Sequence, residues 1–94
     1  MNFENFRNDL ENKISSITKF ELQEYHFEPH CFGNGILVYR IKGRIHKFEY
    51  DGREDLLTWY VGPPHVKYFG AELKFIMTIV GLMIETETLK DELN

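Results

Sequence analysis

The residues that come nearest to a catalytic set are Asp51, Asp55 and the triplet Glu72-Leu73-Lys74. If the fold brought them together, the carboxylates could hold Mg²⁺ and the lysine could orient an attacking water molecule. The same Glu-x-Lys spacing also makes an ordinary exposed strand face, because alternate side chains point to one side of a strand. A small Mg²⁺-dependent nuclease-like enzyme is therefore one alternative, and it requires that these side chains converge.

A second group of chemically versatile residues lies between His26 and Cys31. His26, Glu28 and His30 recur at every second position, so one strand face could present three zinc ligands. However, Pro29 interrupts the strand before His30, and no recurring zinc-ligand spacing is present. Cys31 and His30 are sequence neighbours whose side chains point apart in an extended chain, which does not suit a nucleophile and its base. We therefore predict no metal, no cofactor and no catalytic residue.

Charge is distributed unevenly along this chain, whose net charge is −4. Residues 1–34 hold three basic and six acidic side chains, residues 35–53 five and two, and residues 54–94 three and seven. The middle stretch is a basic island in which Arg40 and Arg44 could dock an acidic partner or phosphate groups. A solvated strand edge explains the same residues more simply. The net acidity argues against general nucleic-acid binding.

The C-terminal segment carries four closely spaced carboxylates. They are Glu85, Glu87, Asp91 and Glu92. Such residues usually form a solvated helix face, but they could instead imitate phosphates and occupy the basic groove of a nucleic-acid enzyme. Complementary charge of this kind raises association rate and specificity. Tyr68 and Phe69 are candidate aromatic anchors for the same interface.

Two successive β-hairpins are predicted between residues 35 and 62. Lys42-Gly43 is a two-residue turn signal between apolar runs, and Asp51-Gly52 opens a second, polar turn before a strand at 56–61. The first turn fixes which residues face each other across the strands. The predicted pairs are Ile41 with Arg44, Tyr39 with His46, Leu37 with Phe48, and Gly35 with Tyr50.

The remaining elements are expected to cover one face of these hairpins. Helical spacing of apolar residues predicts a helix over 3–16, and a strand is predicted over 20–27 with a bulge at 23–24. Alternation favours a strand over 71–80, although the same residues would also suit a buried helix. A short acidic helix is predicted over 86–93.

Length and composition further limit the possible fold class and location of the protein. A chain of 94 residues is of single-domain size, and a hydrophobic content of 43% argues against disorder. The single cysteine, Cys31, excludes an internal disulfide and favours a reducing compartment. The N-terminus lacks the basic patch and apolar run of a secretory signal, and no stretch is apolar enough to span a membrane. We therefore expect a cytoplasmic protein.

These observations predict one α+β domain over residues 1–94, in which an N-terminal helix packs on a four- to five-stranded, mostly antiparallel β-meander and a short acidic helix follows. The predicted function is that of a small acidic protein that inhibits a basic protein partner such as a bacterial nuclease or toxin, without binding nucleic acid or membrane. Toxin-immunity proteins and phage-encoded inhibitors of CRISPR nucleases have this profile. A third alternative is a homodimer that pairs sheet edges or buries Tyr60, Tyr68 and Phe69.

Overall fold

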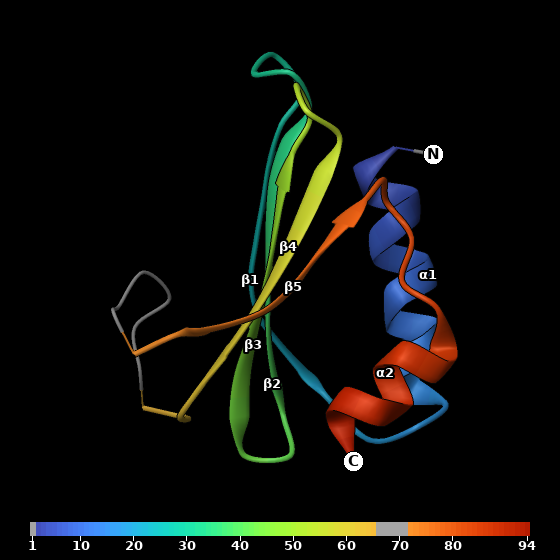
Figure 1. Ribbon diagram of the computed structural model, residues 1–94, viewed down its shortest axis with the longest axis vertical. Helices are drawn as coiled ribbons and strands as arrows, with labels where there is room; N and C mark the ends of the chain where they lie inside the picture. Colours follow the sequence, from blue (N-terminus) through green and yellow to red (C-terminus); the bar gives the residue numbers. More distant parts are fainter. Residues whose placement is uncertain (1, 66–71) are drawn as a thin grey trace.

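The computed structural model describes residues 2–65 and 72–94. In chain order its elements are α1 (Phe3–Ser15), β1 (Glu21–Glu28), β2 (Asn34–Ile41), β3 (Arg44–Asp51), β4 (Leu56–Gly62), β5 (Lys74–Val80) and α2 (Thr86–Leu93). Each strand pairs antiparallel with the next, so the sheet has the meander order β1-β2-β3-β4-β5. Both helices lie on the same side of the sheet (Figure 1). The predicted α+β fold is confirmed.

Helix α1 begins and ends where its sequence provides the signals. The side chain of Asn2 accepts a hydrogen bond from the backbone N–H of Asn5 at 2.8 Å, which caps the first turn. The apolar residues of α1 recur three or four positions apart, so they form one stripe that faces the sheet. They are Phe3, Phe6, Leu10 and Ile14, and all four are buried.

The hairpin of β2 and β3 has the predicted register, including the pair of Leu37 with Phe48. Both residues of its turn have positive φ, 50° at Lys42 and 74° at Gly43, as a tight two-residue turn requires. The predicted bulge in β1 is also present, between Leu22 and Glu24. A second bulge interrupts the pairing of β4 with β5. Both edge strands of the sheet are therefore irregular, which hinders further strand pairing.

Residues 74–80, whose sequence suits either a strand or a buried helix, form strand β5. Its residues pair with β4 from Val61 opposite Lys74 to Leu56 opposite Val80, so cross-strand pairing prevails over a helix. Gly81 then takes a φ of 91°, which ends the strand. Among the described residues, no helix combines the length and apolar character needed to cross a bilayer.

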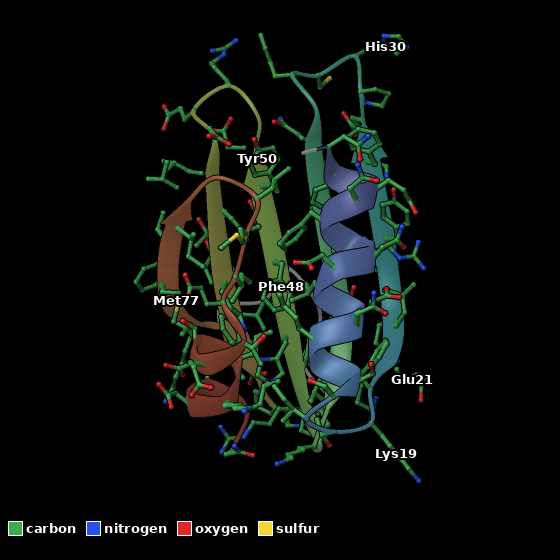
Figure 2. All side chains as sticks on the ribbon, turned by 90° about the vertical axis from the view of Figure 1, so that its right-hand side faces the viewer. Lys19, Glu21, His30, Phe48, Tyr50 and Met77 are labelled. Atoms are coloured by element: carbon green, nitrogen blue, oxygen red, sulfur yellow. The ribbon has the colours of Figure 1, made fainter. Side chains whose placement is uncertain are left out.

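The core lies between the sheet and the two helices. Trp59, Phe48 and Tyr39 have less than 1% of their surface exposed, and the rings of Phe48 and Trp59 are 5.0 Å apart. Figure 2 views the sheet from the side of the helices and shows Phe48 and Tyr50 on β3 beside α1. The indole N–H of Trp59 donates a hydrogen bond to Nδ1 of the buried His46 at 3.0 Å. The core therefore contains no orphan indole donor.

The ring of Phe3 fits directly over Gly35. A Cβ atom at Gly35 would lie 2.5 Å from two atoms of this ring. Gly35 faces Phe27 on β1 and Tyr50 on β3, and the Phe3 ring stacks with both, with centroids 5.6 and 6.2 Å away. The glycine thus forms a depression between two aromatic residues, and this depression seats the first turn of α1.

Polar bonds from α1 to the sheet complement this packing. The carboxylate of Glu11 accepts hydrogen bonds from the phenol of Tyr39 and from Arg7, each at 2.9 Å. Burial, followed by the charge of Glu11, raises the pKa of Tyr39 far above its usual value, so this phenol always donates. The phenol of Tyr25 donates in the same way to Glu4. The acids of α1 thereby orient the helix on the sheet.

Replacing Gly35 with alanine should lower the free energy of unfolding by about 1–3 kcal/mol, because the new methyl group would displace a ring that is packed on all sides. Urea unfolding of the two proteins would measure this difference. The same substitution in a Phe3→Leu background should cost much less, since the ring edge is then absent. Equal costs in the two backgrounds would contradict the seating of Phe3 on Gly35.

His46 should make the fold acid-sensitive. Burial, with a smaller effect of Arg44, lowers the pKa of His46 from 6.5 to about 4, so the native state binds fewer protons than the unfolded state between these values. The free energy of unfolding should therefore decrease as pH falls through this range, by about 3 kcal/mol from His46 alone. His46→Gln keeps an acceptor for Trp59 but does not titrate, so its decrease should be smaller. Parallel pH profiles of the two proteins would show that His46 is not the cause.

Candidate protein-binding site

Helix α2 is held against the body of the protein and presents its acidic side outward. Leu89 and Leu93 are 0% and 5% exposed and pack into the core. The ammonium of Lys13 on α1 donates to the carbonyl of Ile84 at 2.9 Å, and Lys42 donates to Asn94 at 3.1 Å. These contacts fix both ends of the helix. The predicted binding acids are all exposed, namely Glu85, Glu87, Asp91 and Glu92.

The acids of α2 differ from those of α1 in their partners. On α1, Glu4 and Glu11 accept from tyrosines, and Asp9 pairs with Lys13 at 2.8 Å. On α2, Glu87 contacts Lys90 at 3.5 Å. The other three acids, Glu85 at the N-cap of α2 and Asp91 and Glu92 within the helix, form no side-chain hydrogen bond or ion pair within the described part of the chain. The carboxylates of α2 are therefore available to an external partner.

The basic island does not form one surface. Arg40 projects from the sheet face away from the helices and donates to the carbonyl of Pro64 at 3.5 Å. Arg44 faces the opposite way, in register with Ile41, and lines a hollow of about 450 Å³ with Lys74. Arg53 belongs to the same basic stretch of the sequence but lies at the other end of the sheet, where its guanidinium is 4.2 Å from the ring of Phe32. The fold therefore disperses the charges that are adjacent in the sequence.

Lys47, a member of the same basic stretch, is withdrawn from the surface altogether. Its side chain is 6% exposed and its ammonium pairs with Glu49 at 3.0 Å, with the Tyr60 ring 5.9 Å away. Lys47 therefore cannot belong to a basic docking surface.

The predicted anchors Tyr68 and Phe69 lie outside the described residues.

The structure separates the residues of the Mg²⁺ alternative. Asp51 lies opposite Leu56 at one end of β4, and Asp55 is in the adjoining turn, where it accepts a hydrogen bond from Tyr50 at 2.5 Å. Lys74 lies opposite Val61, at the other end of β4. Within residues 2–65 and 72–94, no three His, Cys, Asp or Glu side chains are grouped to hold a metal ion. The four side chains therefore do not share a site.

The second chemically versatile group forms a small polar cluster at the β1–β2 turn. His26 and Glu28 lie on one face of β1, with Nε2 of the imidazole 2.7 Å from the carboxylate. The exposed Cys31 is adjacent, and the Glu28 carboxylate, by accepting from the thiol and by its charge, raises the pKa of Cys31. A thiol with a raised pKa is a poor nucleophile, because the thiolate is the reactive form.

The side of the sheet away from the helices, called the open face below, contains a groove that sequence reasoning missed. The groove has a volume of about 440 Å³. It is lined by His26, Glu28, Asn34, Gly35, Ile36, Glu49, Tyr50, Asp51, Leu56 and Thr58. The signal was present in the alternation of β4: Leu56 and Tyr60 fall in the phase opposite to Leu57 and Trp59, so both faces of this strand carry large side chains.

Comparisons with known proteins do not add to this geometry. No protein-family model matches the chain, and neither the curated proteins nor the solved structures that were searched contain a match. The function therefore has to be argued from the site itself.

Cys31 should react slowly with alkylating reagents although it is exposed, because Glu28 raises the pKa of its thiol. Glu28→Gln removes the negative charge and should accelerate alkylation by iodoacetamide at mildly alkaline pH. The rate would be followed by mass spectrometry over a pH series. Unchanged rates in the variant would mean that Glu28 does not control the thiol.

Proposed function

We propose that this protein is a small acidic binding module that inhibits a basic protein partner, of which a bacterial nuclease or toxin is the best-fitting class. The observation that carries the proposal is the contrast between the helices. The carboxylates of α1 are engaged within the protein, whereas three of the four on α2 have no partner among the described residues.

The exposed carboxylates of α2 are suited to binding a cationic surface. Exposed acidic side chains that lie close together gain electrostatic energy when a cationic surface approaches. A nucleic-acid enzyme has such a surface, since its groove must bind phosphates. Carboxylates that occupy this groove would exclude the nucleic acid by competition, and no catalytic group is needed.

The attachment of α2 supports the same proposal. Leu89 and Leu93 hold the helix on the core, and Lys13 and Lys42 hold its two ends. A fixed array of charges loses little conformational entropy when it binds, whereas a flexible acidic tail would lose more. The arrangement therefore favours a specific partner over loose association with any cation.

A test is to capture partners from a bacterial lysate with the wild-type protein and with a variant that carries Glu85→Gln, Glu87→Gln, Asp91→Asn and Glu92→Gln. The wild type should recover a basic protein at low salt and lose it as salt rises, because screening weakens exposed charge pairs. The variant should bind the recovered protein at least about tenfold more weakly, mainly through slower association.

A matched control separates the position of the charges from the net charge. It neutralises four acids that lie elsewhere, at Glu21, Glu24, Glu54 and Glu72, and so changes the net charge by the same amount. This control should bind as the wild type does. If the α2 variant kept full affinity, or if both variants lost affinity equally, the proposal that α2 carries the interaction would be wrong.

A further inference from the structure

Within the described residues, one end of the open face is covered. Val38 and Ile45 are 0% and 1% exposed there, and Leu73 packs against them. The other half of this face carries side chains of β3, β4 and β5. In the described part of the chain, no helix lies on this side of the sheet (Figure 1). The described residues therefore leave the other half of the open face without a covering helix.

A strip with large apolar side chains at its two ends and two threonines between them runs along β4 and β5 on the open face. Its cross-strand pairs are Leu56 with Val80, Thr58 with Thr78, and Tyr60 with Phe75. Val80 is 78% exposed and Phe75 is 61% exposed. Large apolar side chains that gather on one surface, beside a groove, are typical of an interaction site.

Carboxylates line the neighbouring strands. Asp51 faces Leu56 across β3 and β4, and Glu49 faces Thr58. Glu28 lies on the far side of the same groove, and the side chain of His26, then that of Cys31, lowers the pKa of its carboxyl, so this group is charged at neutral pH. The ten groove-lining residues include these three acids and no lysine or arginine.

Among the described lysines and arginines, Lys47 is the one that forms an ion pair with these acids, and its side chain is largely buried. Lys47 pairs with Glu49, but the Lys47 side chain is 6% exposed and that of Glu49 is 46% exposed. The ammonium pairs with one oxygen of the Glu49 carboxylate, and the Glu49 side chain remains partly exposed. A ligand that approaches the groove meets negative charge beside this strip.

We propose that this half of the open face binds an amphipathic, basic segment of the protein partner. Apolar side chains of the segment would pack on Leu56 and Val80, and its lysines or arginines would pair with Glu28, Glu49 and Asp51. This inference rests on the proposed function and assigns it a second contact surface, apart from α2. The charge complementarity selects this occupant, since an acidic segment would place like charges against Glu28, Glu49 and Asp51.

A second copy of the chain fits this surface less well. Both described helices bury their apolar sides on the other face of the sheet, at Leu10 on α1 and Leu89 on α2, for example. Neither helix can supply an apolar side to the open face without leaving the core. The bulges in both edge strands also oppose extension of the sheet.

The test uses a synthetic peptide of leucine and lysine at helical spacing, titrated into the ¹⁵N-labelled protein. Amide chemical shifts should change at Glu49, Leu56, Thr58 and Val80, and a leucine–glutamate peptide should cause no change. Val80→Lys should weaken binding of the leucine–lysine peptide about tenfold, because it replaces an apolar contact with a like charge. The Val80 side chain is 78% exposed, so this substitution leaves the fold intact.

Asn8→Lys is the matched control, since it adds the same charge at an exposed residue of α1, on the other side of the sheet. It should leave the affinity unchanged. Shift changes confined to α2, or equal effects of the two lysine substitutions, would overturn the inference while leaving the proposed function standing. Absence of binding, or a wild-type homodimer that Val80→Lys dissociates, would also overturn it. The proposed function itself fails if the lysate yields no salt-sensitive basic partner.

Discussion

The packing of α1 across one face of the sheet is the interaction on which the rest of the structure depends. Phe3 enters the depression at Gly35, while Phe6, Leu10 and Ile14 continue the contact along the helix. The core aromatic residues of the sheet, with Trp59 and Phe48 among them, all point toward this helix side. Burial of these large side chains is the main favourable contribution to folding. Because the main core forms on one face, the other face, which carries the smaller cluster of Val38 and Ile45, remains partly free for other contacts.

This constraint also decides which acids remain available. The position of α1 brings Glu4 and Glu11 against tyrosines of the sheet, so their charges serve the fold. Helix α2 covers the end of the same core with only Leu89 and Leu93, and its acids face solvent. On the open face, Glu49 pairs with the buried Lys47 and is still partly exposed. The carboxylates of α1 thus stabilise the fold, whereas those of α2 can contact a partner.

Much of the fold could be predicted because its signals are local. The register of β2 and β3 follows from the Lys42-Gly43 turn and from alternation, and both are confirmed. The acidic helix over 86–93 is confirmed with the same bounds, and the helix predicted over 3–16 ends one residue earlier. The strand predicted over 71–80 is confirmed over Lys74–Val80. These elements depend on neighbours in the sequence or on one hairpin partner.

The arrangement of charges could not be predicted in the same way, because it depends on contacts between distant residues. Arg53 is close to Arg40 and Arg44 in the sequence, yet it stacks on Phe32 at the opposite end of the sheet. The burial of Lys47 and Val38 occurs on a strand face that alternation alone assigns to solvent. The groove joins residues of β1, β2, β3 and β4, so its three carboxylates converge only after the sheet has formed.

Zero-length carbodiimide cross-linking of the protein to its captured basic partner would test the central claim most directly, because it joins a carboxylate to a lysine amine only where the two are in contact. The account predicts cross-links from Glu85, Glu87, Asp91 or Glu92, and none from the engaged acids of α1. Cross-links that formed through α1 and spared α2 would contradict the division of charge on which the proposed function rests.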